Sequence, residues 1–336
     1  MKQGMKELED NSTSCAMGQV KLLNAFETRR TNCIACGSNK IVFWGSKERS
    51  GIMFRIDRCE NCGTAFMNPR PSLEYLMSEI YSTSGHGLTA PITLDAILEL
   101  EREYPNATRD AKTLVRVALN YLHPTHGSRK ALDVGSGYGF YSKEALEAGF
   151  EVTAINPGRW ENLIARQLTG LEPIERAFEE VEFNMHFDLI ILSQVLEHMY
   201  DPQAVLGKVR RLLTKGGIVA IAVPNFNWIL VRLLRERENG VLWVPEHLNY
   251  FTETGLRALL TSTGFKILEV RHVARIPYYA ISRRAHLAGN LRLVANSMVR
   301  IIQWIPMRIL EQLKSGITIQ VWARAKKAQA EGRMEG

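Results

Sequence analysis

The chain has 336 residues, 46% of them hydrophobic, so it can bury one large core and a smaller second one. Its net charge of +7 suits an anionic partner, but the 42 basic and 35 acidic residues are mixed along the chain and form no dense patch for a nucleic acid. No apolar stretch follows the first charged residues, and no segment approaches the roughly 20 apolar residues of a membrane-spanning helix, so we expect a cytoplasmic protein without a secretory signal.

The sequence pattern divides the chain into segments. A polar stretch without a sustained period comes first, and two prolines within residues 68–72 close a segment that holds two cysteine pairs. Apolar residues at three- and four-residue spacing predict helices over 95–104 and 111–122. The predicted parts are a mobile tail over 1–28, a cysteine module over 29–72, a helical linker over 73–127, an α/β domain over 128–275, an insertion over 276–315, and a last strand with a tail over 316–336.

From Lys130 onward, short apolar runs alternate with helical stretches. This alternation predicts a parallel sheet covered by helices on both faces, which is a doubly wound α/β fold. The predicted strands are 131–134, 151–155, 187–193, 216–224, 265–270 and 316–325. The insertion before the last strand is long for a plain connection, and its apolar helical stripe at 295–315 predicts a lid, a subunit contact or a peripheral membrane contact.

A glycine-rich turn follows the first predicted strand of this domain. Asp133 ends the strand, and Gly135, Gly137 and Gly139 stand at alternate positions before an amphipathic helix. Glycines permit a tight turn and let a ligand approach the backbone, while the helix N-terminus offers unpaired N–H groups. The turn reads G-S-G-Y-G-F, so its third glycine comes one place too early for the dinucleotide fingerprint.

This turn and the segments after it resemble the class I S-adenosylmethionine-dependent methyltransferases. Three further segments match in the same order, namely 187–202 at the fourth strand, 212–225 at the fifth and 255–270 before and within the sixth. The resemblance covers about 128–275 and the final strand. It implies a seven-stranded, Rossmann-like sheet and S-adenosylmethionine as the methyl donor.

The resemblance also implies the cofactor site. The glycine turn would cradle the methionine part, and Asn156 stands where the family has an acidic residue that binds the two ribose hydroxyls. An amide accepts a hydrogen bond but lacks the charge of a carboxylate, so we expect ribose binding to be weaker or arranged differently. Phe178 is either an adenine contact or a core aromatic. The implied cofactor residues are Asp133, Gly135, Ser136, Gly137, Tyr138, Gly139, Asn156, Phe178, Ser193 and Gln194.

Two C-x-x-C-G knuckles enclose 22 residues near the N-terminus. Four thiolates from such knuckles, Cys33, Cys36, Cys59 and Cys62, can converge tetrahedrally on one zinc ion, and a site with four protein ligands is structural because no position stays open. The alternative is four buried free cysteines. The pattern resembles the zinc-binding head on a branch of these methyltransferases, sugar C-methyltransferases among them, and predicts a small zinc-ribbon-like module. Cys15 lies outside it.

Methyl transfer to a hydroxyl or an acidic carbon requires alignment of the reactants and removal of a proton. Histidine suits this task because its ordinary pKa is near neutrality. Glu197 and His198 follow the fourth strand, and Glu246 and His247 lie in a proline-marked loop that resembles the family's P-x-H-x-x-x-F segment. His198, His247 and Glu246 are the catalytic candidates, although His198 also suits a structural role. Tyr138 and Tyr250 are candidate acceptor contacts or core residues, and Thr252 or Thr254 is the expected cap of the next helix.

The predicted function is methyl transfer to oxygen or carbon of a small or carbohydrate-like acceptor, as in secondary-metabolite or surface-polysaccharide synthesis. One alternative is an RNA methyltransferase, but the sequence SQVLEH stands where many base-methylating enzymes have a D/N-P-P-aromatic motif. A second alternative is a silent fold that uses its cofactor pocket or zinc head for binding. The intact glycine turn favours an enzyme over this silent fold.

Overall fold

The computed structural model describes residues 26–76, 78, 93–103, 105–123, 129–275 and 306–326. The predicted tail over 1–28 therefore lies almost entirely outside the described residues, as do Cys15 and most of the predicted insertion and its stripe at 295–315. Of that insertion, the described residues 306–312 are helical. Within the described part, every helix is too short or too polar to cross a bilayer.

Among the described residues, the central sheet has six strands in the order β5-β4-β6-β7-β10-β9. The first four are parallel, whereas β10 runs antiparallel to both of its neighbours. The sheet is therefore mixed, not purely parallel as expected, while the Rossmann-like α/β class is confirmed. At the position expected for a seventh strand, beyond β5, the described residues form an isolated parallel bridge between Ile155 and Ile174. The strands are β4 (Arg129–Val134), β5 (Phe150–Ile155), β6 (Phe187–Ser193), β7 (Leu213–Pro224), β9 (Phe265–Val273) and β10 (Thr318–Ala325).

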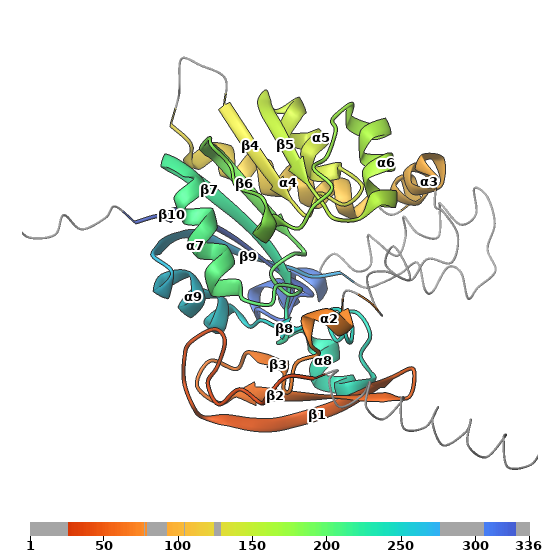
Figure 1. Cartoon of the computed structure of the whole chain (residues 1–336), viewed down its shortest axis with the longest axis vertical. Helices are drawn as coiled ribbons and strands as arrows, with labels where there is room; N and C mark the ends of the chain where they lie inside the picture. Colours follow the sequence, from red (N-terminus) through yellow and green to blue (C-terminus); the bar gives the residue numbers. More distant parts are fainter. Residues whose placement is uncertain are drawn as a thin grey trace, which may run out of the picture.

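Helices cover both faces of this sheet (Figure 1). Alternate residues of β6 point to opposite faces, and all but one residue of the strand are buried. On one face Leu189 and Ile191 pack with α4 and α5, and Trp322 Nε1 of β10 donates to the Leu114 carbonyl of α4 at 2.8 Å. On the other face α7 and α9 cover Ile190. The helices are α2 (Leu73–Tyr75), α3 (Leu94–Glu103), α4 (Asn106–Tyr121), α5 (Phe140–Glu147), α6 (Arg159–Thr169), α7 (Pro202–Leu212), α8 (Ile229–Leu234) and α9 (Glu253–Ser262), with the 3-10 turns η2 (Phe178–Glu180) and η3 (Arg235–Arg237).

A second sheet lies beside α8, with β1 and β2 at the opposite end of the molecule from β4 and β5 (Figure 1). Its strands pair antiparallel in the order β1 (Ile41–Arg49), β2 (Ile52–Cys59), β3 (Ala65–Met67) and β8 (Asn249–Tyr250). Residues of β2 and β3 share a hydrophobic core with Trp228, Val241 and Leu248. The sheet and core of the predicted cysteine module are thus completed by chain from the predicted α/β domain.

Candidate active site and cysteine cluster

The glycine turn between β4 and α5 adopts backbone conformations that favour glycine. Gly135 and Gly137 have φ values of +65° and +51°. A Cβ on Gly135 would lie 2.6 Å from Val195 Cγ2, so this position has no room for a side chain. A Cβ on Gly137 would meet nothing nearer than the Gly135 carbonyl oxygen, at 4.0 Å. Gly137 therefore marks the open side of the turn, where a ligand can approach the backbone.

Asp133 supports this turn from within. Its carboxylate is 1% exposed and accepts a hydrogen bond of 2.6 Å from Ser142 Oγ of α5. Burial raises the pKa of Asp133 to about 7. Two further hydroxyls at this edge, Ser136 Oγ and Ser193 Oγ, are buried; Ser136 Oγ has no hydrogen-bond partner among the described residues, and Ser193 Oγ lies near the Tyr141 hydroxyl. Buried polar atoms are normally paired, so the Ser136 hydroxyl fits a polar group of a bound ligand.

Asn156 follows β5, and its amide is already engaged. Its Nδ2 donates to the Gly158 carbonyl and to Asn162 Oδ1, both at 3.1 Å, and Asn162 Nδ2 donates to the Asn156 carbonyl at 2.9 Å. Asn156 therefore has only its side-chain oxygen left for a ligand. Phe178 is 3% exposed within the main core, and Lys208 Nζ lies 4.9 Å from its ring centroid, so an adenine contact there stays a prediction. Gln194 is exposed beside β6 with a left-handed φ of +55°.

The structure brings Glu197, His198 and His247 together. One ligand atom from each lies within 4.8 Å of the others, and the two imidazole rings meet edge to face with centroids 4.8 Å apart. His198 Nδ1 lies 2.9 Å from the Glu246 carbonyl oxygen, and His247 Nδ1 lies 2.7 Å from the Val241 carbonyl oxygen. A carbonyl can only accept, so both Nδ1 atoms carry a proton, and when the ring is neutral its lone pair is on Nε2.

Burial sets the charge of this cluster. Glu197 is 0% exposed, and neither carboxylate oxygen has a hydrogen-bond partner among the described residues. Desolvation raises the pKa of Glu197 to about 8 and lowers the pKa of His247 to about 4. Near pH 7 the cluster thus has a protonated Glu197 carboxyl beside a neutral His247 imidazole. It can accept or relay a proton, and its three ligand atoms lie close enough to share a divalent cation.

Glu246 lies outside the cluster and faces the N-terminal sheet. Its carboxylate accepts from Arg49 Nη1 of β1 at 2.8 Å, and the same guanidinium donates to the Val244 carbonyl at 2.9 Å. Its backbone oxygen contacts His198. Tyr250 is 1% exposed in the second core, with its ring 6.0 Å from that of Phe226. Neither arrangement follows from the local sequence, because both depend on residues distant in the chain.

The four cysteines converge as the knuckle pattern predicts. The Sγ atoms of Cys33 and Cys62 are 3.6 Å apart, as are those of Cys36 and Cys59, and all four lie within 4.8 Å of one another. A disulfide would bring a pair to about 2 Å. Four thiolates at about 2.3 Å from a central zinc ion would stand about 3.8 Å apart, which is close to the observed spacing. The donor set and its geometry therefore fit a tetrahedral metal site.

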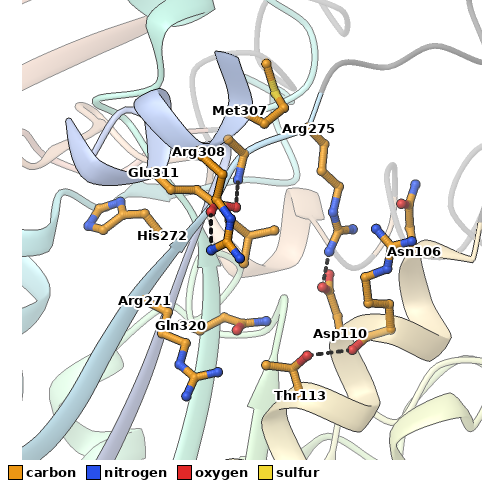
Figure 2. A pocket seen from close by; sticks show the side chains of 13 residues that line it. Asn106, Asp110, Thr113, Arg271, His272, Arg275, Met307, Arg308, Glu311 and Gln320 are labelled. Atoms are coloured by element: carbon orange, nitrogen blue, oxygen red, sulfur yellow. Dashed lines mark hydrogen bonds and ion pairs between the residues drawn. The ribbon is translucent and has the colours of Figure 1, made fainter. Parts of the chain in front are cut away.

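A charged hollow lies between α4, the end of β9 and the helix over 306–312 (Figure 2). The strand register places the hollow near the edge of the sheet where the glycine turn lies. Val273 at the end of β9 pairs with Thr318, which in turn pairs with Pro224 at the end of β7. Gln320 in its wall is fully buried, and its amide has no partner among the described residues. Charged residues lining the hollow are Arg109, Asp110, Arg271, Arg275, Arg308 and Glu311.

Comparisons with known proteins agree with the fold. A family model described as a methyltransferase domain matches residues 106–270. The ubiquinone biosynthesis O-methyltransferase of Bradyrhizobium sp. (strain ORS 278) is 27% identical over 182 residues, which are 51% of this chain and 72% of that protein. The enzyme of the same name from Aeromonas salmonicida is 27% identical over 188 residues, 52% of this chain and 76% of that protein.

Among solved structures, a SAM-dependent methyltransferase from Thermotoga maritima aligns with a TM-score of 0.44 and 17% identity, over 69% of this chain and 97% of that one. The family match and the curated relatives support the same activity. The chain carries a methyltransferase domain over residues 106–270 and is an S-adenosylmethionine-dependent methyltransferase.

Proposed function

We propose that this protein transfers a methyl group to an oxygen of a small-molecule acceptor and that His247 removes the acceptor's proton. The proposal is carried by the neutral His247 imidazole, which has its lone pair on Nε2 beside Glu197. Oxygen is favoured over carbon because the curated relatives are named O-methyltransferases. A carbohydrate-like acceptor remains compatible with the same chemistry.

The residues at the ends of β4, β5 and β6 fit S-adenosylmethionine, which supplies an electrophilic methyl group when bound. The open side of Gly137 would admit the amino-acid part, and the buried hydroxyls of Ser136 and Ser193 would meet polar groups. The oxygen of Asn156 would accept from the ribose, with Tyr138, Gly139, Phe178 and Gln194 around it as predicted. Asp133 would act indirectly, because its carboxylate is bound to Ser142 and holds the turn in place.

Proton removal would use Glu197 and His247 as a coupled pair. A proton that leaves an acceptor hydroxyl moves to His247 Nε2, and an ionised Glu197 carboxylate then stabilises the imidazolium. A protonated Glu197 cannot do so. Because burial raises the pKa of Glu197 to about 8, activity should rise as the pH increases toward that value. His198 would hold the loop that carries Glu246 through its bond to that residue's carbonyl, and the Glu246 carboxylate would anchor the loop to Arg49.

The hollow in Figure 2 supports an acceptor with an acidic group. Four arginines and two carboxylates line it, which leaves an excess of positive charge. The Asp110 carboxylate is paired with Arg275. A carboxylate or phosphate on the acceptor could pair with Arg109 or Arg271 while the buried Gln320 amide donates to it.

We also propose that the four cysteines hold one structural zinc ion. The spacing of their Sγ atoms supports this, and the backbone N–H of Ala35 points at Cys33 Sγ at 3.4 Å, as expected for a ligand thiolate. Four protein ligands leave no site for substrate, so zinc would act through stability and not through chemistry.

Calorimetric titration with S-adenosylhomocysteine tests the cofactor site. Gly137→Arg should abolish binding, because the side chain would enter the open side of the turn. Gly149→Arg is the matched control: Gly149 also has a left-handed φ, +84°, and open space for a side chain, but it follows α5 at the other edge of the sheet. Wild-type protein that binds neither S-adenosylhomocysteine nor S-adenosylmethionine would refute the function.

Methyl transfer to hydroxylated aromatic and sugar acceptors, with and without an acidic group, tests the second step. His247→Gln should lower kcat by about 100-fold or more while cofactor affinity stays unchanged. The exposed His186→Gln is the control. Activity that disappears on addition of a chelator and returns with Mg²⁺ would instead indicate that the cluster acts by holding a cation.

A further inference from the structure

We propose that the Glu161 carboxylate binds the ribose hydroxyls and supplies the negative charge that Asn156 cannot supply. The ribose-binding carboxylate would then come from the first turn of α6 instead of from the end of β5. The inference rests on the proposed binding of S-adenosylmethionine. It concerns a residue that the resemblance to the family does not mark.

The first observation is where the Glu161 side chain lies. It is 4% exposed and folds back over Gly158, the residue before α6. A Cβ placed on Gly158 would overlap the Glu161 carboxylate, with Cδ at 2.9 Å, and would stand 3.1 Å from Asn156 Nδ2. The carboxylate therefore occupies the space directly above Gly158 and beside the Asn156 amide.

The second observation concerns Tyr138 in the glycine turn. Burial, and after it the charge of Glu161, raises the pKa of the Tyr138 hydroxyl in the glycine turn. Glu161 is thus within electrostatic reach of the turn as well as of Asn156. The carboxylate therefore lies beside Asn156, in the segment that would hold the ribose, and its charge reaches the glycine turn that would hold the amino-acid part.

The chemistry of a ribose explains the arrangement. Two adjacent hydroxyls donate two hydrogen bonds, and a carboxylate accepts both with the added strength of its charge. Asn156 has one oxygen to offer, because its amide hydrogens already bond to Gly158 and Asn162. Glu161 also lies in the first turn of α6, where the positive end of the helix dipole attracts negatively charged side chains.

Glu161 also stands where a glutamate caps a helix, three residues after Gly158. A carboxylate has about four acceptor positions, so capping and ribose binding are compatible. The two roles differ in what they predict. A cap stabilises the protein whichever ligand is present, whereas a ribose contact matters only for ligands that carry the hydroxyls.

The experiment is calorimetric titration with two ligands, S-adenosylhomocysteine and its 2′,3′-dideoxy analogue. Glu161→Gln should weaken binding of the first by about 10- to 100-fold and of the second by less than about 3-fold, because only the first presents the hydroxyls. Glu172→Gln is the matched control, since Glu172 follows the same helix with a side chain 69% exposed. It should change neither affinity.

A second variant places a carboxylate at position 156, after the end of β5, in place of the one at position 161. Asn156→Asp combined with Glu161→Gln should restore affinity for S-adenosylhomocysteine to within about 5-fold of wild type. Equal losses for both ligands, or no loss in Glu161→Gln, would overturn the inference and leave a helix cap, which a lower Tm without ligand would reveal. If the wild type binds neither ligand, the proposed function fails first and the inference fails with it.

Discussion

The glycine turn of the proposed cofactor site and the cysteine-bearing sheet are built in opposite ways. The glycine turn is local: Asp133, the glycines and Ser142 lie within one strand, one turn and one helix. The cysteine-bearing sheet takes three strands from residues 41–67 and its fourth from 249–250. A local motif can be recognised from the sequence alone, whereas the cysteine-bearing sheet is complete only after segments distant in the chain have come together.

The two regions are joined through buried polar contacts. Arg70 is 1% exposed, donates from Nη1 to the Tyr200 carbonyl and donates from Nη2 to Asn249 Oδ1 at 3.1 Å. Asn249 Nδ2 donates in turn to the carbonyls of Leu196 and Met199, at 3.1 and 2.7 Å. The loop that carries Glu197 is therefore held by residues of the second sheet, and we expect the two regions to unfold together.

Loss of one thiol from the proposed zinc site should have the largest effect on both regions. Cys59→Ser should remove bound zinc and lower the Tm by more than about 10 °C, because folding free energy is coupled to metal binding and this thiol is fully buried. Atomic absorption and a thermal melt measure the two effects. The sheet should not melt alone, because Cys59 packs in the same core cluster as Leu256 of α9.

Cys15→Ser serves as the control because Cys15 lies outside both knuckles and outside the described residues. One zinc ion per chain in wild type and in this control, but not in Cys59→Ser, is the expected result. A full zinc content in Cys59→Ser would contradict the four-thiolate site. Two separate melting transitions in the wild type would contradict the joint unfolding.

Removal of the Arg70 side chain should have the next largest effect. Arg70→Met keeps much of the apolar volume but leaves the Tyr200 carbonyl and Asn249 Oδ1 without their donor, at a cost of about 3 kcal/mol. Urea unfolding measures the change. Arg58→Met, on an exposed position of the same sheet, should cost less than about 0.5 kcal/mol. Equal costs for the two variants would show that the junction does not stabilise the protein.

The pH dependence of stability should report Glu197. Its folded pKa, about 8, lies above the ordinary value of 4.5, so the folded protein holds this proton more tightly than the unfolded chain. The stabilisation is complete below the unfolded value and is lost as the pH rises through about 8. In buffer without added divalent cations, the unfolding free energy of wild type should fall relative to Glu197→Gln by up to about 1.4 kcal/mol per pH unit in this window. Parallel pH profiles would show that the carboxyl is not buried as described.

Much of the fold could be predicted because its signals are periodic and local. The helices expected over 95–104 and 111–122 are α3 and α4, and the strand expected over 187–193 is β6 with the same bounds. The cap expected at Thr252 or Thr254 is Thr252, which accepts from the Gly255 N–H at 3.0 Å. The direction of β10 could not be predicted, since an apolar run fits a parallel or an antiparallel neighbour equally well.

The candidate site was predictable only in part. The residue spacing of the glycine turn and of the cysteine knuckles is enough to predict their geometry. The two candidate histidines, His198 and His247, are in contact as expected for one site. Glu246 stands beside His247 in the sequence, but its carboxylate pairs with Arg49, 197 residues earlier in the chain. The burial that shifts the pKa of Glu197 and the position of Glu161 over Gly158 both depend on tertiary packing. Such contacts leave no pattern in a single sequence.

The smallest predicted effect concerns the contact between α9 and a cysteine knuckle. Thr252 Oγ1 accepts from the Gly255 N–H and donates to the Cys62 carbonyl at 2.6 Å, so one hydroxyl caps the helix and ties it to the knuckle. Thr252→Ala should cost about 1–2 kcal/mol, or a few degrees in Tm. The exposed Thr254→Ala should cost less than about 0.5 kcal/mol. Thr252→Ser keeps the hydroxyl and should recover most of the loss, so a serine variant as unstable as the alanine one would assign the effect to the methyl group instead.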